Sequence, residues 1–298
     1  MNENSMNTYD IIIIGKGPAG VSAAIYGARA NKKVLVIAKD FGWLAKTDMI
    51  ENYYGFEQPV NAKDLLDTGI RQARRFGVVF EDAEVTGVEK QDEFTVTTTT
   101  ASYTSKVVVI ATGMPRNKAR IQNLAAFEGR GVSYCATCDG FFYRGKSIGV
   151  VGNGDYAYKE ATELLPFTKN ITLFTNGRNY EGQTTSPAMF DPNIKTDLRK
   201  IKTIDGVDKI EKIIFDDDSI TLIDGLFIAE GTASALDLAY TMGIENDGKT
   251  ITVDKKQATN IPGLFAAGDC TGGVLQVSVA VGEGAAAGIS AVEYLGRK

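Results

Sequence analysis

The sequence predicts an α/β protein built from two Rossmann-like, three-layer domains of the dinucleotide-binding type. The main observation is a pattern that occurs twice: a buried strand runs into a glycine turn, a helix follows, and a second strand completes the unit. The first copy covers residues 9–37 and the second covers 147–174. The chain of 298 residues is long enough for two domains of roughly 150 residues each.

The first glycine turn reads Gly15-Lys16-Gly17-Pro18-Ala19-Gly20 and has the spacing of a dinucleotide fingerprint. It lies between an expected strand, 9–14, and an alanine-rich helix expected over 21–30. The first glycine of such a turn allows a tight bend, the second lets backbone approach a pyrophosphate, and the third lets the helix pack close to the strand. The second strand, 34–37, ends at Ala38-Lys39-Asp40, so the acid that usually binds ribose is displaced or missing.

Between the two glycine turns, the pattern predicts a helix and a small antiparallel meander. Apolar residues including Leu66, Ile70 and Ala73 mark one side of a helix over 64–76. Alternation of β-branched residues over 85–90 and 94–100 predicts two strands. Residues 41–54 show no periodicity and are expected to form a loop.

The second glycine turn, Gly152-x-Gly154-x-x-Ala157, occurs in the same frame but lacks the chemistry of a nucleotide site. A 2′-phosphate is usually bound by arginines after the second strand. Residues 175–181 contain one arginine, Arg178, together with Glu181, which would repel phosphate. Tyr156 is bulky where the helix should admit a ligand. A scaffold that has kept its fold and lost its nucleotide is therefore favoured over a working nucleotide site.

Two further strands end in residues that suit a cofactor. The strand 106–110 is followed by Ala111-Thr112-Gly113, where small residues let a cofactor lie against the backbone. A strand before Gly268-Asp269 places a carboxylate where it can accept hydrogen bonds from ribityl hydroxyls. The helix expected over 276–295 carries five consecutive glycines and alanines, and such a helix can lie close to a cofactor with its N-terminus towards it.

The segment Cys135-Ala136-Thr137-Cys138-Asp139 places two thiols three positions apart, close enough to bridge. Such a pair is a redox dithiol, half of a metal site, or two packed thiols. Zinc needs four ligands, usually Cys or His, and the chain has no histidine and one further cysteine, Cys270. A redox dithiol is therefore favoured, no metal site is expected, and Cys270 is assigned to packing.

Composition argues against several functional classes. The net charge of −5 does not indicate binding to nucleic acid or to an anionic membrane. Apolar runs such as 11–14 are too short to span a bilayer. Three cysteines give no disulfide framework, and the first residues do not resemble a signal peptide. We expect a cytoplasmic protein with no nucleic-acid or membrane partner.

Together these features resemble the low-molecular-weight thioredoxin reductase family, and the resemblance covers nearly the whole chain. Its landmarks, in order, are the first glycine turn, Ala111-Thr112-Gly113, the Cys135–Asp139 segment, the second glycine turn and Gly268-Asp269. The resemblance implies a discontinuous FAD-binding domain, 1–113 and 243–298, with an inserted NADPH-domain-like redox domain, 114–242, that carries the two cysteines. It also implies a homodimer with thioredoxin as the substrate.

The resemblance also assigns roles to individual residues. It implies that Cys138 lies next to the flavin C4a, that Cys135 meets the substrate disulfide, and that Asp139 is the acid/base. The alternative for Asp139 is a charge at a helix end; without histidine, a carboxylate is the expected proton shuttle. The implied FAD contacts are Gly15, Gly17, Pro18, Ala19, Gly20, Asn52, Val85, Ala111, Thr112, Gly113, Gly268, Asp269, Gln276 and Val277.

The sequence departs from the family where NADPH would bind, because the family's three arginines fall on Asn176, Gly177 and Glu181. This pattern is most similar to the ferredoxin-dependent flavin thioredoxin reductases, so reduced ferredoxin is the expected electron donor. The alternatives are an NAD(P)H-dependent thioredoxin reductase and a non-catalytic flavin redox sensor. Basic residues within 116–120 and 195–202 are candidate docking patches for an acidic ferredoxin.

Overall fold

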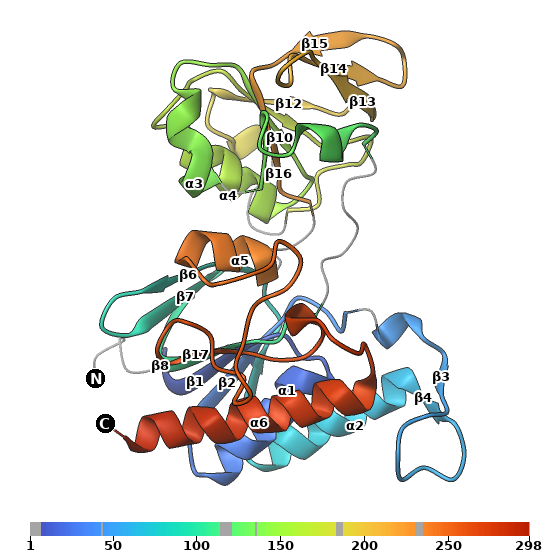
Figure 1. Cartoon of the computed structure of the whole chain (residues 1–298), viewed down its shortest axis with the longest axis vertical. Coiled ribbons are helices and arrows are strands. Elements are labelled where there is room, and N and C mark those ends of the chain that lie inside the picture. The colour runs from blue at the N-terminus through green and yellow to red at the C-terminus, as the bar shows by residue number, and fades with distance from the viewer. Residues whose placement is uncertain are drawn as a thin grey trace. The chain divides into compact units, whose positions relative to one another are not determined.

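The computed structural model describes residues 7–42, 44–113, 121–134, 136–182, 187–230 and 235–297, leaving out the side chains of Lys46, Thr137 and Cys138. The chain forms two compact units (Figure 1). The first combines two separated stretches, Met1–Pro115 and Ser234–Lys298, and the second is Arg116–Ala233. Both units contain a parallel sheet with helices, which confirms the predicted α/β fold class.

The first unit is built on one seven-stranded sheet. Its strands are β1 (Thr8–Ile14), β2 (Val34–Ile37), β5 (Val79–Glu81), β6 (Val85–Lys90), β7 (Phe94–Thr98), β8 (Ser102–Ile110) and β17 (Leu264–Ala266). They lie in the order β5-β2-β1-β8-β7-β6, with β17 also paired to β8. All pairs are parallel except the meander of β6, β7 and β8. The Ile and Val runs of β1 and β8 are buried on both faces, as is typical of covered parallel strands.

Helices cover this sheet. Helices α1 (Pro18–Arg29), α2 (Ala62–Arg75) and α6 (Val277–Gly296) lie together on one side of it (Figure 1), and α5 (Ala235–Met242) contacts β6. Asn61 caps the N-terminus of helix α2. Its side chain accepts hydrogen bonds from Lys63 N and Asp64 N and so satisfies two free amides of the first turn. The short strands β3 (Met49–Ile50) and β4 (Val60–Asn61) pair antiparallel before α2.

Helix α6 packs so closely on α1 that two positions require glycine. A Cβ on Gly284 would lie 2.1 Å from the carbonyl oxygen of Ala19, and a Cβ on Gly288 would lie 2.6 Å from that of Ala23. Ser22 Oγ also donates a hydrogen bond to the carbonyl of residue 281, at 2.8 Å. The run of small residues in α6 therefore serves helix packing, and the expected contact of its N-terminus with a cofactor stays a prediction.

The second unit has a five-stranded parallel sheet in the order β12-β11-β10-β16-β9 and a separate three-stranded antiparallel sheet. The first contains β9 (Val132–Ser133), β10 (Ile148–Val151), β11 (Ile171–Phe174), β12 (Ile194–Asp197) and β16 (Gly225–Ile228), and the second contains β13 (Ile201–Asp205), β14 (Lys212–Phe215) and β15 (Ile220–Leu222). The core joins the two sheets, with the rings of Phe174 and Phe215 5.8 Å apart. Helix α3 (Ala136–Asp139) packs on helix α4 (Asp155–Leu164).

The sequence predicted most element types, with differences at the ends. The first helix begins at Pro18, three residues before the expected start, because proline suits the first helical position. The strand expected to reach residue 100 ends at Thr98, and the expected loop 41–54 contains β3. Residues 235–242, expected in the inserted segment, form α5 and belong to the first unit.

The contact of α1 and α6 predicts the effect of a single methyl group. Gly284→Ala should destabilise the first unit by about 1–3 kcal/mol because the added Cβ meets the Ala19 carbonyl, which is backbone and cannot rotate away. Gly282→Ala is the matched control: it is exposed, meets no atom of the described residues within 4 Å, and should stabilise α6 by about 0.5–1 kcal/mol. Urea unfolding of both variants measures the difference, and equal midpoints would contradict this packing.

Candidate functional site

The first glycine turn connects β1 to α1 with two steric constraints. Gly15 has a φ of 116°, and a Cβ there would lie 2.1 Å from the carbonyl oxygen of Ala111. A Cβ on Gly20 would lie 1.9 Å from the carbonyl oxygen of Gly15. By contrast, a Cβ on Gly17 would meet no atom of the described residues within 4 Å. Gly17 is the N-cap of α1, so backbone faces open space at the place where a dinucleotide site holds phosphate.

The ends of β8 and β17 meet this turn. Backbone hydrogen bonds from Ala111 N to the Ile14 carbonyl, 2.8 Å, and from Ala267 N to the Ile110 carbonyl, 2.9 Å, join the carboxyl ends of the three strands. Thr112 follows at this edge, and its Oγ1 is buried without a hydrogen-bond partner in the described part of the chain. The half-buried Asp269 lies beyond β17, and burial raises the pKa of its carboxyl group. Segments distant in sequence therefore form one polar edge with space beside it.

The other expected cofactor contacts are distributed around the first unit. Asn52 Nδ2 donates a hydrogen bond to Gln276 Oε1 at 2.9 Å, which links the loop after β3 to the residue before α6. Val277 is the first residue of α6. Val85 is a buried residue at the start of β6. The orphaned Thr112 hydroxyl and the open backbone at Gly17 fit a cofactor that carries phosphate and hydroxyl groups.

Two lysines of the first unit form ion pairs that the sequence did not predict. Lys39 lies just after β2, and its Nζ binds Glu84 Oε2 at 2.9 Å, with Glu84 almost fully buried. A carboxylate therefore does stand near this strand end, where an acid usually binds ribose, but it comes from the segment before β6. Lys16 is also buried, pairs with Asp82, and lies 4.6 Å from the ring centre of Phe41. No local spacing signals these pairs, because each joins two segments that are far apart in the sequence.

The dithiol segment begins the short helix α3. Cys135 lies outside the described residues, and Cys138 is in α3 without a described side chain. The expected acid/base Asp139 is partly buried, and its Oδ2 accepts a hydrogen bond from Ser133 Oγ at 2.6 Å. Burial, and then the negative charge of Asp139, raise the pKa of Tyr143. The carboxylate of Asp139 is thus held in a fixed orientation beside the dithiol helix.

Two exposed aromatic rings follow the dithiol directly. Phe141 and Phe142 belong to the 3-10 turn Gly140–Tyr143, and they are 63% and 66% exposed. Their rings meet edge to face with centroids 6.0 Å apart, and the Arg144 guanidinium lies 5.4 Å from the Phe141 ring centre. Large exposed apolar side chains of this kind are typical of protein–protein contact sites.

The second glycine turn is covered by its own chain. Glu181 N donates to the Asn153 carbonyl at 2.6 Å, and Asn153 Nδ2 donates to the Asn179 carbonyl at 3.2 Å. Tyr180 OH donates to Asp155 Oδ1 at 3.2 Å, at the first residue of α4. We call residues 178–182 the covering segment. It binds the Asn153 carbonyl, the Asn153 side-chain amide and the Asp155 carboxylate, so it lies against the turn where a dinucleotide would approach.

Aromatic stacking holds the covering segment. The ring of Phe190 stacks on Tyr158 of α4 with centroids 4.2 Å apart, and Tyr180 meets Phe190 edge to face at 5.1 Å. Tyr156, which the sequence analysis expected to crowd a ligand, is 3% exposed and lies inside the unit. Tyr180 and its neighbours, rather than Tyr156, lie where a ligand would approach the second glycine turn.

The arginine after β11 is bound to an acid. Arg178 Nη2 pairs with Glu230 Oε1 at 2.6 Å, and Asn176 Nδ2 donates to the same oxygen at 3.3 Å. Glu230 follows β16, so the second unit supplies its own anion at the position where a 2′-phosphate would need free cations.

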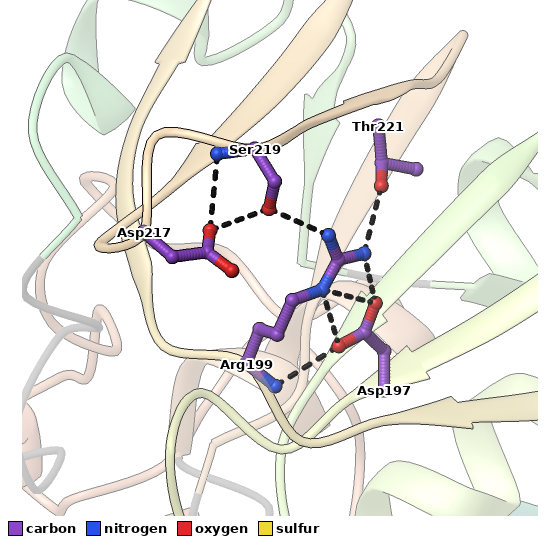
Figure 2. Close-up of polar contacts among 5 residues, drawn as sticks. All are labelled: Asp197, Arg199, Asp217, Ser219 and Thr221. Atoms are coloured by element: carbon purple, nitrogen blue, oxygen red, sulfur yellow. Dashed lines mark hydrogen bonds and ion pairs between the residues drawn. The ribbon is translucent and has the colours of Figure 1, made fainter.

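A second arginine nearby is also fully engaged. Arg199 binds both carboxylate oxygens of Asp197, donates to Ser219 Oγ at 2.7 Å and to Thr221 Oγ1 at 3.1 Å (Figure 2), and its guanidinium lies 3.8 Å from the Phe215 ring centre. Asp197 adjoins the end of β11, because its carbonyl accepts a hydrogen bond from residue 175 at 2.9 Å. Arg199 is therefore fixed as a structural ion pair.

The fold and these edges define a two-unit oxidoreductase of the dinucleotide-binding class. Residues 9–284 match the family described as pyridine nucleotide-disulphide oxidoreductase. Thioredoxin reductase of Listeria monocytogenes is 33% identical, with 96% of this chain and 94% of that protein covered. The chain therefore belongs to the pyridine nucleotide-disulphide oxidoreductases, among the thioredoxin reductases, which are flavoproteins.

Two solved structures are also similar to this chain. The atypical thioredoxin reductase of Desulfovibrio vulgaris Hildenborough is 42% identical with a TM-score of 0.91, and 97% of this chain and 98% of that chain are covered. A ferredoxin-flavin thioredoxin reductase from Clostridium acetobutylicum is 30% identical with a TM-score of 0.70, and 98% and 99% are covered.

The described residues contain neither a membrane-spanning helix nor a metal-binding cluster. None of the helices there combines the length and the apolar character needed to cross a membrane. Within the same residues, no group of three or more His, Cys, Asp or Glu side chains is arranged to hold a metal ion.

Cys270 has the properties of a structural thiol. It is 2% exposed, its Sγ lies 3.3 Å from the carbonyl oxygen of Ala267, and burial raises the pKa of the thiol to about 12. Near neutral pH the thiol is therefore protonated, and the protonated form is a poor nucleophile.

This burial predicts that Cys270 resists alkylation. In the native protein at mildly alkaline pH, only about one Cys270 in ten thousand is a thiolate, so iodoacetamide should leave it unmodified. In denaturant the same residue should be labelled fully. Peptide mass spectrometry of both samples is the measurement, and native labelling as fast as in denaturant would contradict the assignment to packing.

Proposed function

We propose that this chain is a thioredoxin reductase that binds FAD and passes electrons through the Cys135/Cys138 dithiol to thioredoxin, with reduced ferredoxin as the donor. The observation that carries the choice of donor is the covered second glycine turn, whose nearby arginines are already paired with acids. The proposal includes a homodimer, from the family resemblance, and a cytoplasmic location, from the cysteine usage.

The first unit supplies the groups for the cofactor. Gly15, Gly17 and Gly20 would hold the pyrophosphate, and Thr112 and Asp269 would bind hydroxyl or ring polar groups. Asn52 and Gln276, joined by their hydrogen bond, would line the same site. When bound, FAD supplies the chemistry that converts single-electron delivery into the electron pair that a disulfide requires.

The dithiol transfers that pair by thiol–disulfide exchange. The Cys135 thiolate attacks one sulfur of the thioredoxin disulfide, which forms a mixed disulfide and releases one thioredoxin thiolate. Cys138 then attacks Cys135, which releases the second thiolate and leaves a Cys135–Cys138 disulfide. Two electrons pass to thioredoxin, and its two thiolates take up two protons. Asp139, oriented by Ser133, would move one of those protons.

The exposed rings after the dithiol support a protein substrate. A small disulfide does not need an apolar surface of this size, whereas a protein partner gains affinity by burying aromatic side chains. Phe141 and Phe142 are placed within four residues of Cys138, so a partner that contacts them brings its disulfide close to the dithiol.

The choice of donor rests on electrostatics in the second unit. An NADPH 2′-phosphate would meet Glu181 and an Arg178 that is already paired with Glu230. Each missing charge-assisted hydrogen bond costs about 1.5–3 kcal/mol, so two or three missing bonds weaken binding by a factor of hundreds or more. The similar C. acetobutylicum protein, named a ferredoxin-flavin thioredoxin reductase, supports the same choice.

Of the two basic patches expected to dock ferredoxin, only 195–202 lies within the described residues. Residues 116–120 lie outside the described residues. In the patch 195–202, Arg199, Lys200 and Lys202 pair with Asp197, Asp216 and Asp218, so most of its positive charge is neutralised. This patch therefore offers little attraction for an acidic partner.

An NAD(P)H-dependent thioredoxin reductase remains the second candidate. It is favoured by Gly154, where a Cβ would meet no atom of the described residues within 4 Å, and by the description of the matching family as pyridine nucleotide-disulphide oxidoreductase. A non-catalytic flavin sensor is the third, and steady-state reduction of thioredoxin would exclude it.

The donor is tested anaerobically through the visible flavin band. Reduced ferredoxin should bleach the band rapidly, whereas micromolar NADPH should bleach it negligibly because Arg178 and Arg199 near the turn are already paired with acids. NADH, which lacks that phosphate, separates phosphate repulsion from obstruction by Tyr180. Dithionite is the control that the flavin can be reduced. Rapid stoichiometric bleaching by NADPH would replace the ferredoxin assignment with the second candidate.

Cofactor binding is tested at Asp269. Asp269→Ala should weaken FAD binding by about 10- to 100-fold, the effect of losing one charge-assisted hydrogen bond, and should purify mostly as apoprotein. The readout is flavin absorbance per chain and FAD titration of the apoprotein. Asp92→Ala, at an exposed turn of the same unit, is the matched control and should keep its flavin. An Asp269→Ala variant that binds FAD as tightly as the wild type would remove this role.

A further inference from the structure

A buried carboxylate of α4 contacts the backbone of the dithiol segment. Glu160 is 5% exposed, and its Oε2 accepts a hydrogen bond from Ala136 N at 2.9 Å. Ala136 follows Cys135 directly in the chain and is fully buried. Glutamate is almost never buried to this extent unless it is bound to partners, because removing its charge from water is costly. The carboxylate is therefore held against the backbone amide that follows Cys135, at an energetic cost that an apolar residue would not impose.

Contacts from two other elements hold the short helix that carries the dithiol. Glu160 binds the amide at its first residue, and Ser133 of β9 binds Asp139 at its last residue. A helix of four residues is not stable alone, since the nucleation of a helix is unfavourable. These contacts consequently fix the backbone on which Cys138 lies and to which Cys135 is joined.

We propose that Glu160 is a positioning residue for the dithiol: it fixes the backbone after Cys135, and its negative charge disfavours the thiolate forms and makes the dithiol a stronger reductant. This inference rests on the proposed function, in which Cys135 and Cys138 alternate between dithiol and disulfide. Forming the disulfide removes two electrons and two protons from the pair. A charge that destabilises the thiolates destabilises the reduced state, so the pair gives up its electrons more readily.

The other charged groups on α3 and on the elements packed against it also have partners. On α4, Asp155 accepts a hydrogen bond from Tyr180, and Lys159 Nζ pairs with Glu163 Oε1 at 3.0 Å. At the end of α3 itself, just before the turn Gly140–Tyr143, Asp139 accepts a hydrogen bond from Ser133 and contributes to the raised pKa of Tyr143. Within the described residues of these elements, Glu160 is the carboxylate whose hydrogen bond reaches the amide next to Cys135.

Glu160→Gln separates the charge from the hydrogen bond, because the amide oxygen of glutamine can still accept from Ala136 N. The full-length reduced protein is labelled with iodoacetamide across neutral to alkaline pH, and mass spectrometry follows Cys135 and Cys138 separately. Removing the charge should lower the pH midpoint of labelling and raise the rate at neutral pH by about three- to tenfold. Equilibration against dithiothreitol at mildly alkaline pH should favour the reduced form by about fivefold or more.

Two further variants make the test specific. Glu163→Gln, on the same helix and partly exposed, should leave both measurements unchanged. Glu160→Asp keeps the charge and should stay near the wild-type midpoint, and it serves as the test if Glu160→Gln fails to fold. Aspartate keeps the charge but is too short to keep the same hydrogen bond to Ala136 N. If the pH midpoint of labelling in Glu160→Asp is as low as that expected for Glu160→Gln, the effect belongs to the hydrogen bond and the electrostatic role is overturned.

Failure of the role proposed for Glu160 can be distinguished from failure of the proposed function. If wild-type protein interconverts between dithiol and disulfide but Glu160→Gln matches it in labelling profile and equilibrium, the inference is overturned and Glu160 is only a structural acceptor. If wild-type protein shows no interconversion against dithiothreitol, the proposed function itself fails, and the role of Glu160 fails with it.

Discussion

The approach of a carbonyl oxygen to the first glycine of each strand–helix turn is the constraint on which both units depend. In the first unit the Ala111 carbonyl, just after β8, lies 2.1 Å from where a Cβ of Gly15 would be; in the second, the Ala229 carbonyl, just after β16, lies 2.2 Å from that of Gly152. In each case the neighbouring strand pairs in parallel with the strand that leads into the turn. Glycine is therefore demanded by the crossing of two chain segments, whether or not a ligand is bound. This explains how the second turn keeps its glycine while its own chain covers it.

The two units differ in what lies outside that shared turn. At Gly17 the first unit leaves backbone facing open space, and the Thr112 hydroxyl lacks a partner in the described part of the chain. In the second unit, residues 179–181 bind the Asn153 carbonyl, the Asn153 side-chain amide and the Asp155 carboxylate. The backbone at Gly154 is as open as that at Gly17, since a Cβ there would meet no atom of the described residues within 4 Å. The two copies therefore differ in the segment that lies against the turn, and this difference is a stronger argument about ligands than the glycine spacing, which both copies share.

The sequence predicted features that depend on neighbouring residues and missed those that depend on distant ones. Strands such as β1 and β10 were predictable because their apolar runs are continuous, and the start of α1 follows from Pro18. The pairing of Lys39 with Glu84 was not predictable, because it joins positions 45 residues apart that meet only when β2 pairs with β5 in the sheet. Tyr156 shows the same limit: its bulk was evident from the sequence, but its direction, into the core, depends on packing around α4. The polar edge of the first sheet was predictable in outline, since the carboxyl ends of parallel strands meet at one edge, and its role in binding a cofactor stays a prediction.

The covering segment also affects whether the stability of the second unit depends on nucleotide concentration. A turn that a dissociable nucleotide completes gains stability by mass action, in proportion to the logarithm of the ligand concentration over its dissociation constant. Such a domain is more resistant to heat and proteolysis when the nicotinamide pool is full than when it is depleted. Here the rings of Tyr158, Tyr180 and Phe190 pack beside the turn and belong to the same covalent chain. Their effective concentration therefore does not vary. The stabilisation from these contacts is therefore independent of metabolic state and accompanies each molecule from the moment it folds.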